Sequence, residues 1–173
     1  MATYWAHSAP KGGASQTQRD HLVTVGALAA SFASVLGYAD EAALAGQLHD
    51  CGKYGDLFQL RLEGKASHVD HWSAGAYLAF QAQAVAASLA IHGHHIGLSE
   101  YSSGFFRNLK EWVEGRRQSG DSKILSGPLD ELAARLLADG FERKTLNPQE
   151  RVIDGRPDGN VAIDQMLDIR FLY

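Results

Sequence analysis

Apolar residues return every three or four positions in the first part of the chain, which is the spacing of one helix face. Ser15 or Thr17 can cap the beginning of such a helix with a side-chain oxygen, and Gly37 suits the left-handed turn that ends one. The pattern therefore predicts a long helix over residues 15–36, with His21 near its beginning. Its expected inward positions are Leu22, Val25, Leu28, Ala29, Phe32 and Val35.

A second helix is predicted to follow, capped by Asp40 and ending near Gly52. His49, Asp50 and Lys53 then lie at its C-terminal turn. Asp50 and Lys53 are three residues apart and share a face, whereas His49 points about 100° away from Asp50. Neighbouring side chains converge more easily at the end of a helix than in its middle.

The alanine- and leucine-rich stretch from Asp70 to His92 is also predicted to be helical. It would carry His71 in its first turn and leave the pair His94-His95 beyond its far end. In one straight helix of about twenty residues these two ends would lie roughly 30 Å apart. We therefore predict a break near Gly75 or Ala84, which folds the stretch into two antiparallel helices.

Shorter apolar series predict four further helices, at residues 57–62, 105–117, 128–137 and 161–173. Gly64 is expected to end the first of them. Loops are expected at residues 102–104 and 147–159, where serine, glycine, proline and charged residues gather. Strand signals are scarce, so the pattern predicts an all-α bundle.

A chain of 173 residues with 45% hydrophobic and 21% charged residues fits one soluble globular domain. No apolar run is long enough to span a bilayer, and Met1 is not followed by a secretory leader. The single cysteine, Cys51, cannot form an internal disulfide, and a buried apolar role is favoured over metal ligation. We therefore expect a cytoplasmic protein that does not contact a membrane.

The formal net charge is −4 with histidine neutral, which argues against a domain that holds nucleic acid on a broad basic surface. A nuclease is not excluded, because bound divalent cations would supply positive charge at the phosphates. If DNA is the substrate, a partner chain or a further domain is expected to make most of the binding contacts with it. One set of basic residues either lines a DNA path or belongs to a solvated face with interleaved acids: Arg107, Lys110, Arg116, Arg117 and Lys123.

Five of the eight histidines and one aspartate form a candidate set of metal ligands. Taken alone, His49-Asp50 leaves a metal site and an ordinary polar pair equally open. His21, His71 and the pair His94-His95 favour the metal site, because separate helices would bring them toward one point. Imidazole suits transition metals and a carboxylate can bridge two of them, so the set indicates a dinuclear centre for phosphodiester hydrolysis. Three histidines are expected outside this site, as supporting, exposed or ligand-orienting groups: His7, His68 and His92.

Several ordered runs of residues occur together in the first hundred positions. They are Tyr4–Ser8, His49–Tyr54, Phe58-Gln59, Val69–His71 with Ala74–Ala76, and Gly93–Leu98. As a set they resemble one family, the HD-nuclease domain of the helicase–nuclease of type I CRISPR interference systems. The set is specific, because generic HD phosphohydrolases lack the Trp-Ala-His-Ser start and the Phe-Gln pair.

The resemblance implies an all-α HD-domain bundle and a metal-dependent endo- and exonuclease that cuts single-stranded DNA. Such a domain degrades the strand that is displaced when an RNA-guided surveillance complex opens its target. A fused or separate helicase domain feeds that strand into the nuclease.

Carried over by motif, the resemblance also implies two divalent ions that share Asp50. His49 and Asp50, with His21 alongside, would bind the first ion, and Lys53 would neutralise the scissile phosphate. The second ion would be held by Asp50 and three histidines: His71, His94 and His95. Two ions roughly 3.5–4 Å apart can activate water on one side and stabilise the leaving oxygen on the other. Histidine-rich ligands favour manganese, iron, cobalt or nickel over magnesium.

Two features depart from the family pattern. Family members place a last metal-binding aspartate just beyond a helix that resembles residues 168–173, where this sequence stops. Asp164 and Asp168 are candidate substitutes, but the favoured explanation is a single HD nuclease domain over residues 1–173 that is truncated at its C-terminus. The first metal site would then be weak. Trp72 replaces a small hydroxyl residue of the family and is expected to reshape the rim of the pocket.

Two rival interpretations stay open. An HD phosphohydrolase could act on small nucleotides or cyclic nucleotides instead of DNA. Alternatively, an incomplete metal site would leave a non-catalytic module that docks to a helicase or to an inhibitor protein. Turnover of mononucleotides against oligonucleotides separates the first rival, and metal content with nuclease activity separates the second.

Overall fold

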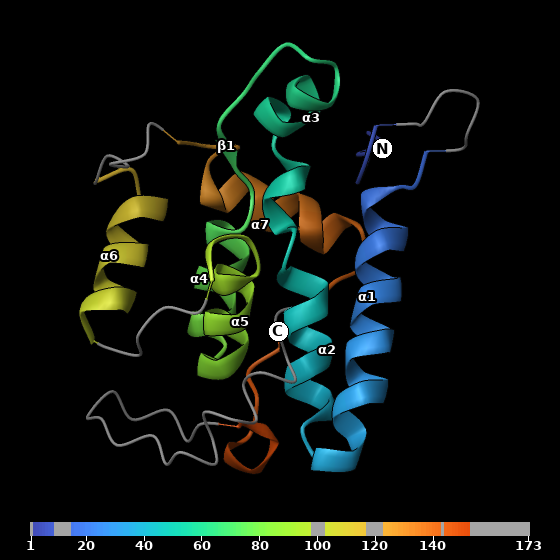
Figure 1. Cartoon of the computed structure of the whole chain (residues 1–173), viewed down its shortest axis with the longest axis vertical. Coiled ribbons are helices and arrows are strands. Elements are labelled where there is room, and N and C mark those ends of the chain that lie inside the picture. The colour runs from blue at the N-terminus through green and yellow to red at the C-terminus, as the bar shows by residue number, and fades with distance from the viewer. Residues whose placement is uncertain (1, 9–14, 98–102, 117–122, 143, 153–173) are drawn as a thin grey trace.

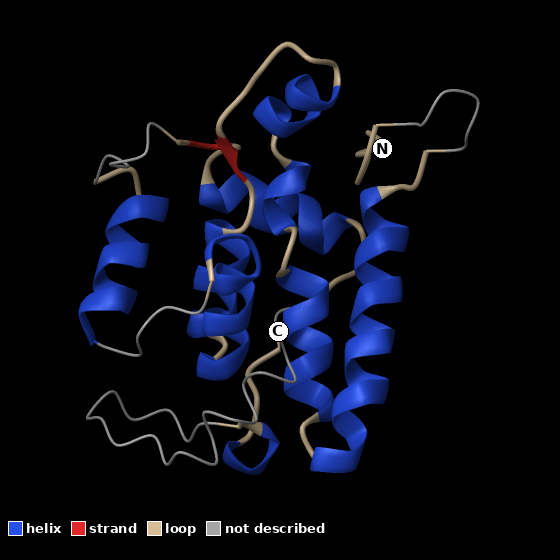
Figure 2. Cartoon of the chain, in the orientation of Figure 1, coloured by secondary structure: helices blue, strands red, loops and turns tan. Residues whose placement is uncertain are grey.

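Helices dominate the computed structural model of the chain, which describes residues 2–8, 15–97, 103–116, 123–142 and 144–152 (Figures 1 and 2). The described residues form seven α-helices, three short 3-10 helices and two strands of two residues each. The prediction of an all-α bundle is therefore confirmed. Among the described residues, no helix combines the length and the apolar character needed to cross a bilayer.

The first two helices, α1 (Gln18–Ala33) and α2 (Ala39–Leu48), lie side by side (Figure 1). Thr17 caps α1, as predicted, by accepting a hydrogen bond from the backbone N–H of Asp20. The short helix η1 (Ser34–Leu36) continues α1 to Gly37, whose φ of 81° is the left-handed turn that the sequence predicted. Asp40 was wrongly predicted as a cap: it lies within the first turn of α2, where it pairs with Lys144 instead.

Several residues of α1 and η1 that were predicted to face inward are exposed instead. Leu22 is fully buried as expected, but Leu28, Phe32 and Val35 are 51%, 71% and 87% exposed. The helix packs on α2 through smaller residues, because a Cβ at Gly46 would lie only 2.7 Å from the backbone of Gly26. Periodicity identifies an apolar stripe, but it does not identify the face that a neighbouring helix covers.

The stretch after residue 70 is broken as predicted, into α4 (Ser73–Gln81) and α5 (Val85–Ile96). The break falls at the turn before Val85, where Gln83 has a φ of 63°, and not at Gly75. Two details of the prediction were wrong. His71 lies before the first turn of α4 rather than in it, and the pair His94-His95 lies in the last turn of α5 rather than beyond it.

The remaining elements complete the bundle, whose right edge in Figure 1 is α1. They are η2 (Cys51–Tyr54), α3 (Asp56–Leu62), α6 (Ser103–Val113), α7 (Leu129–Ala138) and η3 (Pro148–Glu150). The strands β1 (Val69–Asp70) and β2 (Ile124–Leu125) pair in parallel, with Val69 opposite Ile124. Two residues are too short to show a strand period, so the sequence could not predict this pair. Helix α6 also takes in Gly104, which was expected in a loop.

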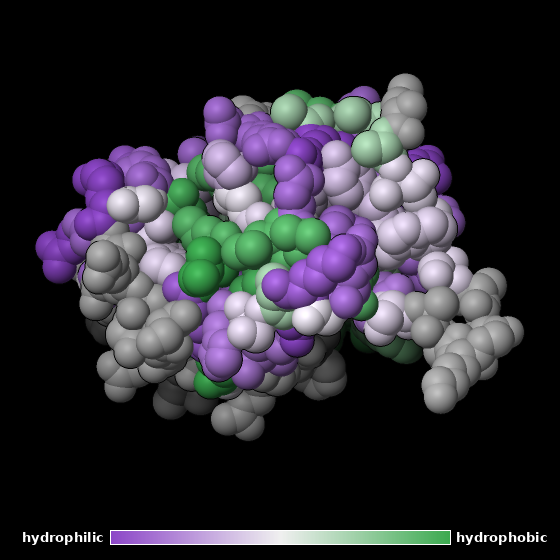
Figure 3. Space-filling view, turned by 90° about the horizontal axis from the view of Figure 1, so that it is seen from above, coloured by the Kyte–Doolittle hydropathy of each residue, from purple (hydrophilic) through white to green (hydrophobic). Residues whose placement is uncertain are grey.

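Three sequence predictions lie wholly or mainly outside the described residues: the helix at 161–173, the substitute ligands Asp164 and Asp168, and most of the loop at 147–159. The described part of that loop contains η3. At the end of the molecule that carries α3 and β1, apolar side chains gather in the middle of the surface and polar ones surround them (Figure 3). Leu60 on α3 and Ile124 on β2 are both exposed.

Candidate metal centre

Four segments that are far apart in the sequence bring the predicted ligands to one cavity. The first turn of α1 carries His21, the end of α2 leads into His49 and Asp50, β1 leads into His71, and the last turn of α5 carries His94 and His95. The cavity has a volume of about 490 Å³. Its lining also includes Ala6, His7, Ser8, Lys53, Phe58, Arg61 and Leu62.

Asp50 lies at the centre of this cavity and is only 4% exposed. Its Oδ2 atom is 3.1 Å from Nε2 of His21, 3.1 Å from Nε2 of His49 and 2.8 Å from Nζ of Lys53. The Lys53 contact confirms that Asp50 and Lys53 lie on one face, but the predicted helix end near Gly52 was wrong. Helix α2 ends at Leu48, and Lys53 lies in η2, which begins after Asp50. The other oxygen, Oδ1, faces a different set of imidazoles.

Oδ1 of Asp50 is 3.4 Å from Nε2 of His71 and 3.8 Å from Nε2 of His94. Possible ligand atoms therefore fall into two groups, each with its atoms within 4.8 Å of one another. We call them the His21 group (His21, His49, Asp50) and the His71 group (Asp50, His71, His94, His95). The structure thus brings together all six residues that the sequence proposed as ligands, with Asp50 in both groups.

Backbone carbonyls fix which imidazole nitrogen can bind a metal ion. Nδ1 of His49 is 2.8 Å from the carbonyl oxygen of Gly46, and Nδ1 of His94 is 2.6 Å from that of Ile91. A carbonyl oxygen only accepts hydrogen bonds, so each Nδ1 carries the proton and donates it. The lone pair of each Nε2 is then directed toward Asp50, which is how protein contacts orient metal-binding histidines.

Imidazole nitrogen atoms face one another across the cavity in a way that suits a cation between them. Nε2 of His71 lies 2.8 Å from Nε2 of His95, and Nε2 of His21 lies 3.2 Å from Nε2 of His49. Oδ1 of Asp50 is buried without a hydrogen-bond partner among the residues described. Clustered lone pairs repel unless a proton or a metal ion lies between them, so the donor set fits divalent metal binding.

The electrostatics keep Asp50 and His71 in their metal-binding forms. Burial by itself raises the pKa of Asp50, but the imidazoles of His21, His49 and His94 that face its carboxylate outweigh it and hold that pKa far below its usual range. Burial lowers the pKa of His71 to about 4, with Asp50 opposing the shift. A carboxylate and a neutral imidazole are the states that bind metal.

Two residues that the sequence analysis did not assign to the site hold the candidate ligands in place. The side-chain N–H of Gln18, fully buried, donates to the backbone carbonyl of Asp50 at 2.9 Å. The backbone N–H of Gly52 donates to the carbonyl of His71 at 2.9 Å, and a Cβ at Gly52 would lie 2.5 Å from that residue. Gln18 precedes His21 by three residues and shares its helix face, which is the signal that could have found it.

The neighbouring aromatic and histidine residues only partly follow their predictions. Trp72 was expected at the pocket rim, but it is buried behind the imidazoles of His71 and His95, with ring centroids 5.2 Å and 4.8 Å away. His7 lines the cavity, 5.1 Å from the ring of His21. Cys51 is fully buried, and burial raises the pKa of its thiol to about 12, as suits an inert core residue.

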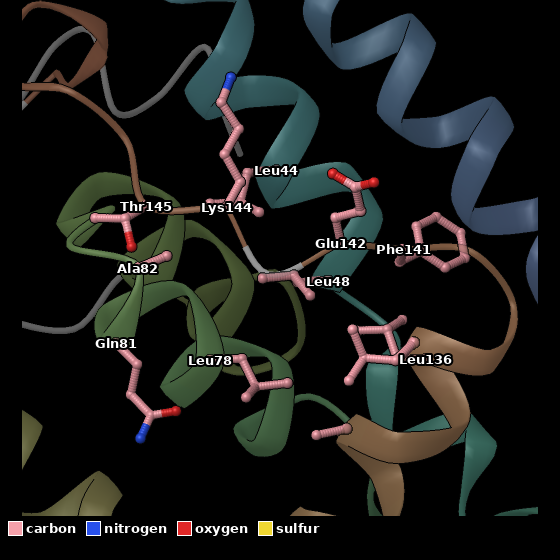
Figure 4. Close-up of a pocket in the computed structure, with 12 residues that line it drawn as sticks. Leu44, Leu48, Leu78, Gln81, Ala82, Leu136, Phe141, Glu142, Lys144 and Thr145 are labelled. Carbon is pink, nitrogen blue, oxygen red and sulfur yellow. The ribbon is translucent and has the colours of Figure 1, made fainter.

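A second cavity of about 240 Å³ lies between α2, α4 and α7 (Figure 4). Leucine side chains dominate its lining, together with Phe141 and the more polar Gln81, Glu142 and Lys144. It contains no histidine and shares no residue with the cavity around Asp50. The chemistry of the ligand groups therefore belongs to the first cavity alone.

Comparison with known families agrees with this geometry. The model of the HD domain family matches residues 19–143, well over half of the chain. The matched range contains both ligand groups and Lys53. No curated protein matches the sequence.

Proposed function

The chain belongs to the HD domain family, and from this premise we propose that it is a metal-dependent nuclease that degrades single-stranded DNA during CRISPR interference. Family membership and the two ligand groups indicate a metal-dependent hydrolase. The motifs shared with the helicase–nuclease family support the narrower proposal. Its substrate would be the strand displaced by an RNA-guided surveillance complex, delivered by a fused or separate helicase domain.

The observation that carries the hydrolase proposal is the position of Asp50 between two groups of imidazoles. One carboxylate oxygen faces the His21 group and the other faces the His71 group. A single carboxylate with both oxygens engaged in this way suits a bridge between two ions. The set is rich in imidazole nitrogen, which favours manganese, iron, cobalt or nickel over magnesium.

When bound, two such ions would supply Lewis acidity and an activated water at neutral pH. The chain itself would hold both ions through Asp50 and keep the imidazole of His71 neutral through burial. Lys53, buried beside Asp50, would place one compact positive charge next to the scissile phosphate. These roles require the phosphodiester to enter the cavity with its charged oxygens toward the ligand groups.

Contacts between the family motifs support the nuclease proposal. The side chain of Gln59 accepts a hydrogen bond from the backbone N–H of Trp5 and donates to its carbonyl, each at 3.1 Å. The same amide donates to the carbonyl of Lys53 at 2.7 Å. Gln59 of the Phe-Gln pair thus fastens the Trp-Ala-His-Ser run against the turn that carries Lys53. That run then forms one wall of the cavity, through Ala6, His7 and Ser8.

Comparing substrates of different size tests the choice of substrate. With Mn²⁺ bound, we expect turnover of a single-stranded oligodeoxynucleotide and little release of phosphate from a deoxynucleoside monophosphate or opening of a cyclic nucleotide. A preference for either small nucleotide would instead support the rival HD phosphohydrolase. Metal content measured on the same sample tests the non-catalytic rival, since a docking module would contain little metal and cleave none of these substrates.

A further inference from the structure

Arg61 is a charged residue that lines the cavity and has no part in the proposed metal binding or in the proposed role of Lys53. It lies in the last turn of α3 and lines the cavity together with Leu62. Its guanidinium carbon is 5.4 Å from the ring centroid of Phe58, and that buried ring is 4.9 Å from the ring of His71. Arg61 therefore belongs to the side of the cavity that holds the His71 group.

The cavity lining agrees with this placement, because Arg61 and His95 both belong to it. On the opposite side of the cavity, the ring of His7 contacts His21. Arg61 therefore lies at one end of the cavity, and the N-terminal run lines the other end.

The guanidinium of Arg61 has no carboxylate partner among the residues that the structure describes. The nearest acid along the chain, Glu63, pairs with Lys65 at 2.6 Å instead. By contrast, Arg135 forms ion pairs with Asp56 and with a glutamate. An arginine that faces a cavity with its donors unused suits an anion, and its planar fork matches two oxygens of a phosphate.

Phe58 sets the relation between this arginine and the hydrolytic centre. Nζ of Lys53 is 5.5 Å from the ring centroid of Phe58, and the Arg61 guanidinium contacts the same ring. Lys53 forms an ion pair with Asp50 within the ligand groups, whereas Arg61 lines the same cavity without belonging to either group. Two cations flanking one fixed ring can hold two phosphates of one strand at the same time.

We propose that Arg61 binds the phosphate next to the scissile one, on the side of the His71 group, and so makes the site select linked phosphodiesters over a lone one. This inference rests on the proposed function and deepens it. Arg61 acts in substrate binding and not in the chemical step. Its loss therefore affects the KM for an oligonucleotide and leaves the hydrolysis of a single phosphodiester unchanged.

The test compares Arg61→Gln with Lys65→Gln, a matched loss of charge just beyond α3 and outside the cavity lining. Two substrates are used with Mn²⁺: a twelve-residue oligothymidylate and bis(p-nitrophenyl) phosphate, which has no second phosphate. We expect Arg61→Gln to raise the KM for the oligonucleotide about tenfold, as for the loss of one charge-assisted pair. The kcat of Arg61→Gln on the oligonucleotide and its kcat/KM on the small diester should equal the values for Lys65→Gln. Equal losses on both substrates, or no loss on either, would overturn the proposal.

Binding without turnover separates this inference from the proposed function. Fluorescence anisotropy of labelled oligothymidylate in EDTA, measured over a series of low salt concentrations, gives the binding constant K without catalysis. Loss of the Arg61 contact should lower the slope of log K against log salt by about 0.7, the value for one neutralised phosphate on a single strand. Suppose that the wild type cleaves no substrate while Arg61→Gln still lowers the salt slope. In that case the proposed function fails and the phosphate site stands. If the affinity and the slope equal those of the wild type, the phosphate site fails.

Discussion

Glu41 shows how a single buried carboxylate can shape stability at a distance from the ligand groups. It lies in the first turn of α2 and is fully buried. One of its oxygens accepts the backbone N–H of Ala87 in the first turn of α5, and the other accepts that of Val152. Burial raises the pKa of Glu41, and these two hydrogen bonds only partly oppose the shift.

The raised pKa gives a pH-dependent prediction. Just above the ordinary glutamate pKa, the folded protein keeps a proton that the unfolded chain has lost, so the free energy of unfolding falls as pH rises through this window. In Glu41→Gln this contribution is removed, and the stability of the variant relative to the wild type should increase with pH. Urea denaturation in EDTA between pH 4 and 7 measures this. Parallel pH profiles for the two proteins would contradict the account.

The sequence predicted which residues come together around Asp50, and it did not predict most of their neighbours. His49, Asp50 and Lys53 could be predicted together because their spacing at a helix end limits where they point. Gln18 could have been found from its position three residues before His21 on the same helix. Arg61 could not be predicted, because its role depends on contacts between separate segments. Arg61 faces the cavity only because α3 packs Phe58 toward His71, and nothing in the local pattern shows that.

Gly75 determines how closely two helices approach. A Cβ at this position in α4 would lie 1.8 Å from the carbonyl oxygen of Leu48, at the end of α2. Leu48 directly precedes His49, so the contact also sets the position of the His49-Asp50 turn beside α4.

Gly75→Ala should therefore destabilise the protein by about 3 kcal/mol, the upper range for overpacking a core. The gain of about 1 kcal/mol that alanine brings to a helix does not offset this clash. Gly127→Ala is the matched control, because its Cβ would meet nothing closer than 3.6 Å. Urea denaturation should place the control within about 0.5 kcal/mol of the wild type. Equal stability of the two variants would show that α2 and α4 can separate at little cost.

Helix positions were more predictable than helix faces. The break before α5 followed from one physical requirement, that His71 and the pair His94-His95 reach the same point. The exposed side chains of Phe32 and Val35 could not be predicted, since α1 packs on α2 through Gly26 and Gly46. The close contact of two glycines replaces the larger apolar contact that periodicity suggested.

Across the whole molecule, the ligand groups join α1, α2, the β1–α4 junction and α5. Metal ions that bind only the folded arrangement should stabilise it, by about 2.7 kcal/mol at a hundredfold excess over Kd. For a chain of this size that corresponds to a rise in Tm of about 5–10 °C. We expect this rise with Mn²⁺ over EDTA for the wild type.

Asp50→Asn is the comparison for this prediction, because Asp50 belongs to both groups. The variant should lose most of the metal-induced rise in Tm, as measured by thermal unfolding followed by circular dichroism. A full rise in the variant would mean that the metal binds elsewhere or without the carboxylate.

The fold as a whole was predictable as a helical bundle from its spacing pattern, but the pairing of β1 with β2 depends on segments more than fifty residues apart.

The most direct test of metal-dependent nuclease activity is cleavage of single-stranded DNA with Mn²⁺, Co²⁺, Ni²⁺ or Fe²⁺ by the wild type, Asp50→Ala and Asp56→Ala. Asp56 is exposed and lies outside both ligand groups, so Asp56→Ala controls for the loss of one carboxylate. We predict cleavage by the wild type and the control, and a loss of about a hundredfold or more in Asp50→Ala because both ions lose a ligand. Undiminished cleavage by Asp50→Ala, or an inactive wild type with every metal, would contradict this account.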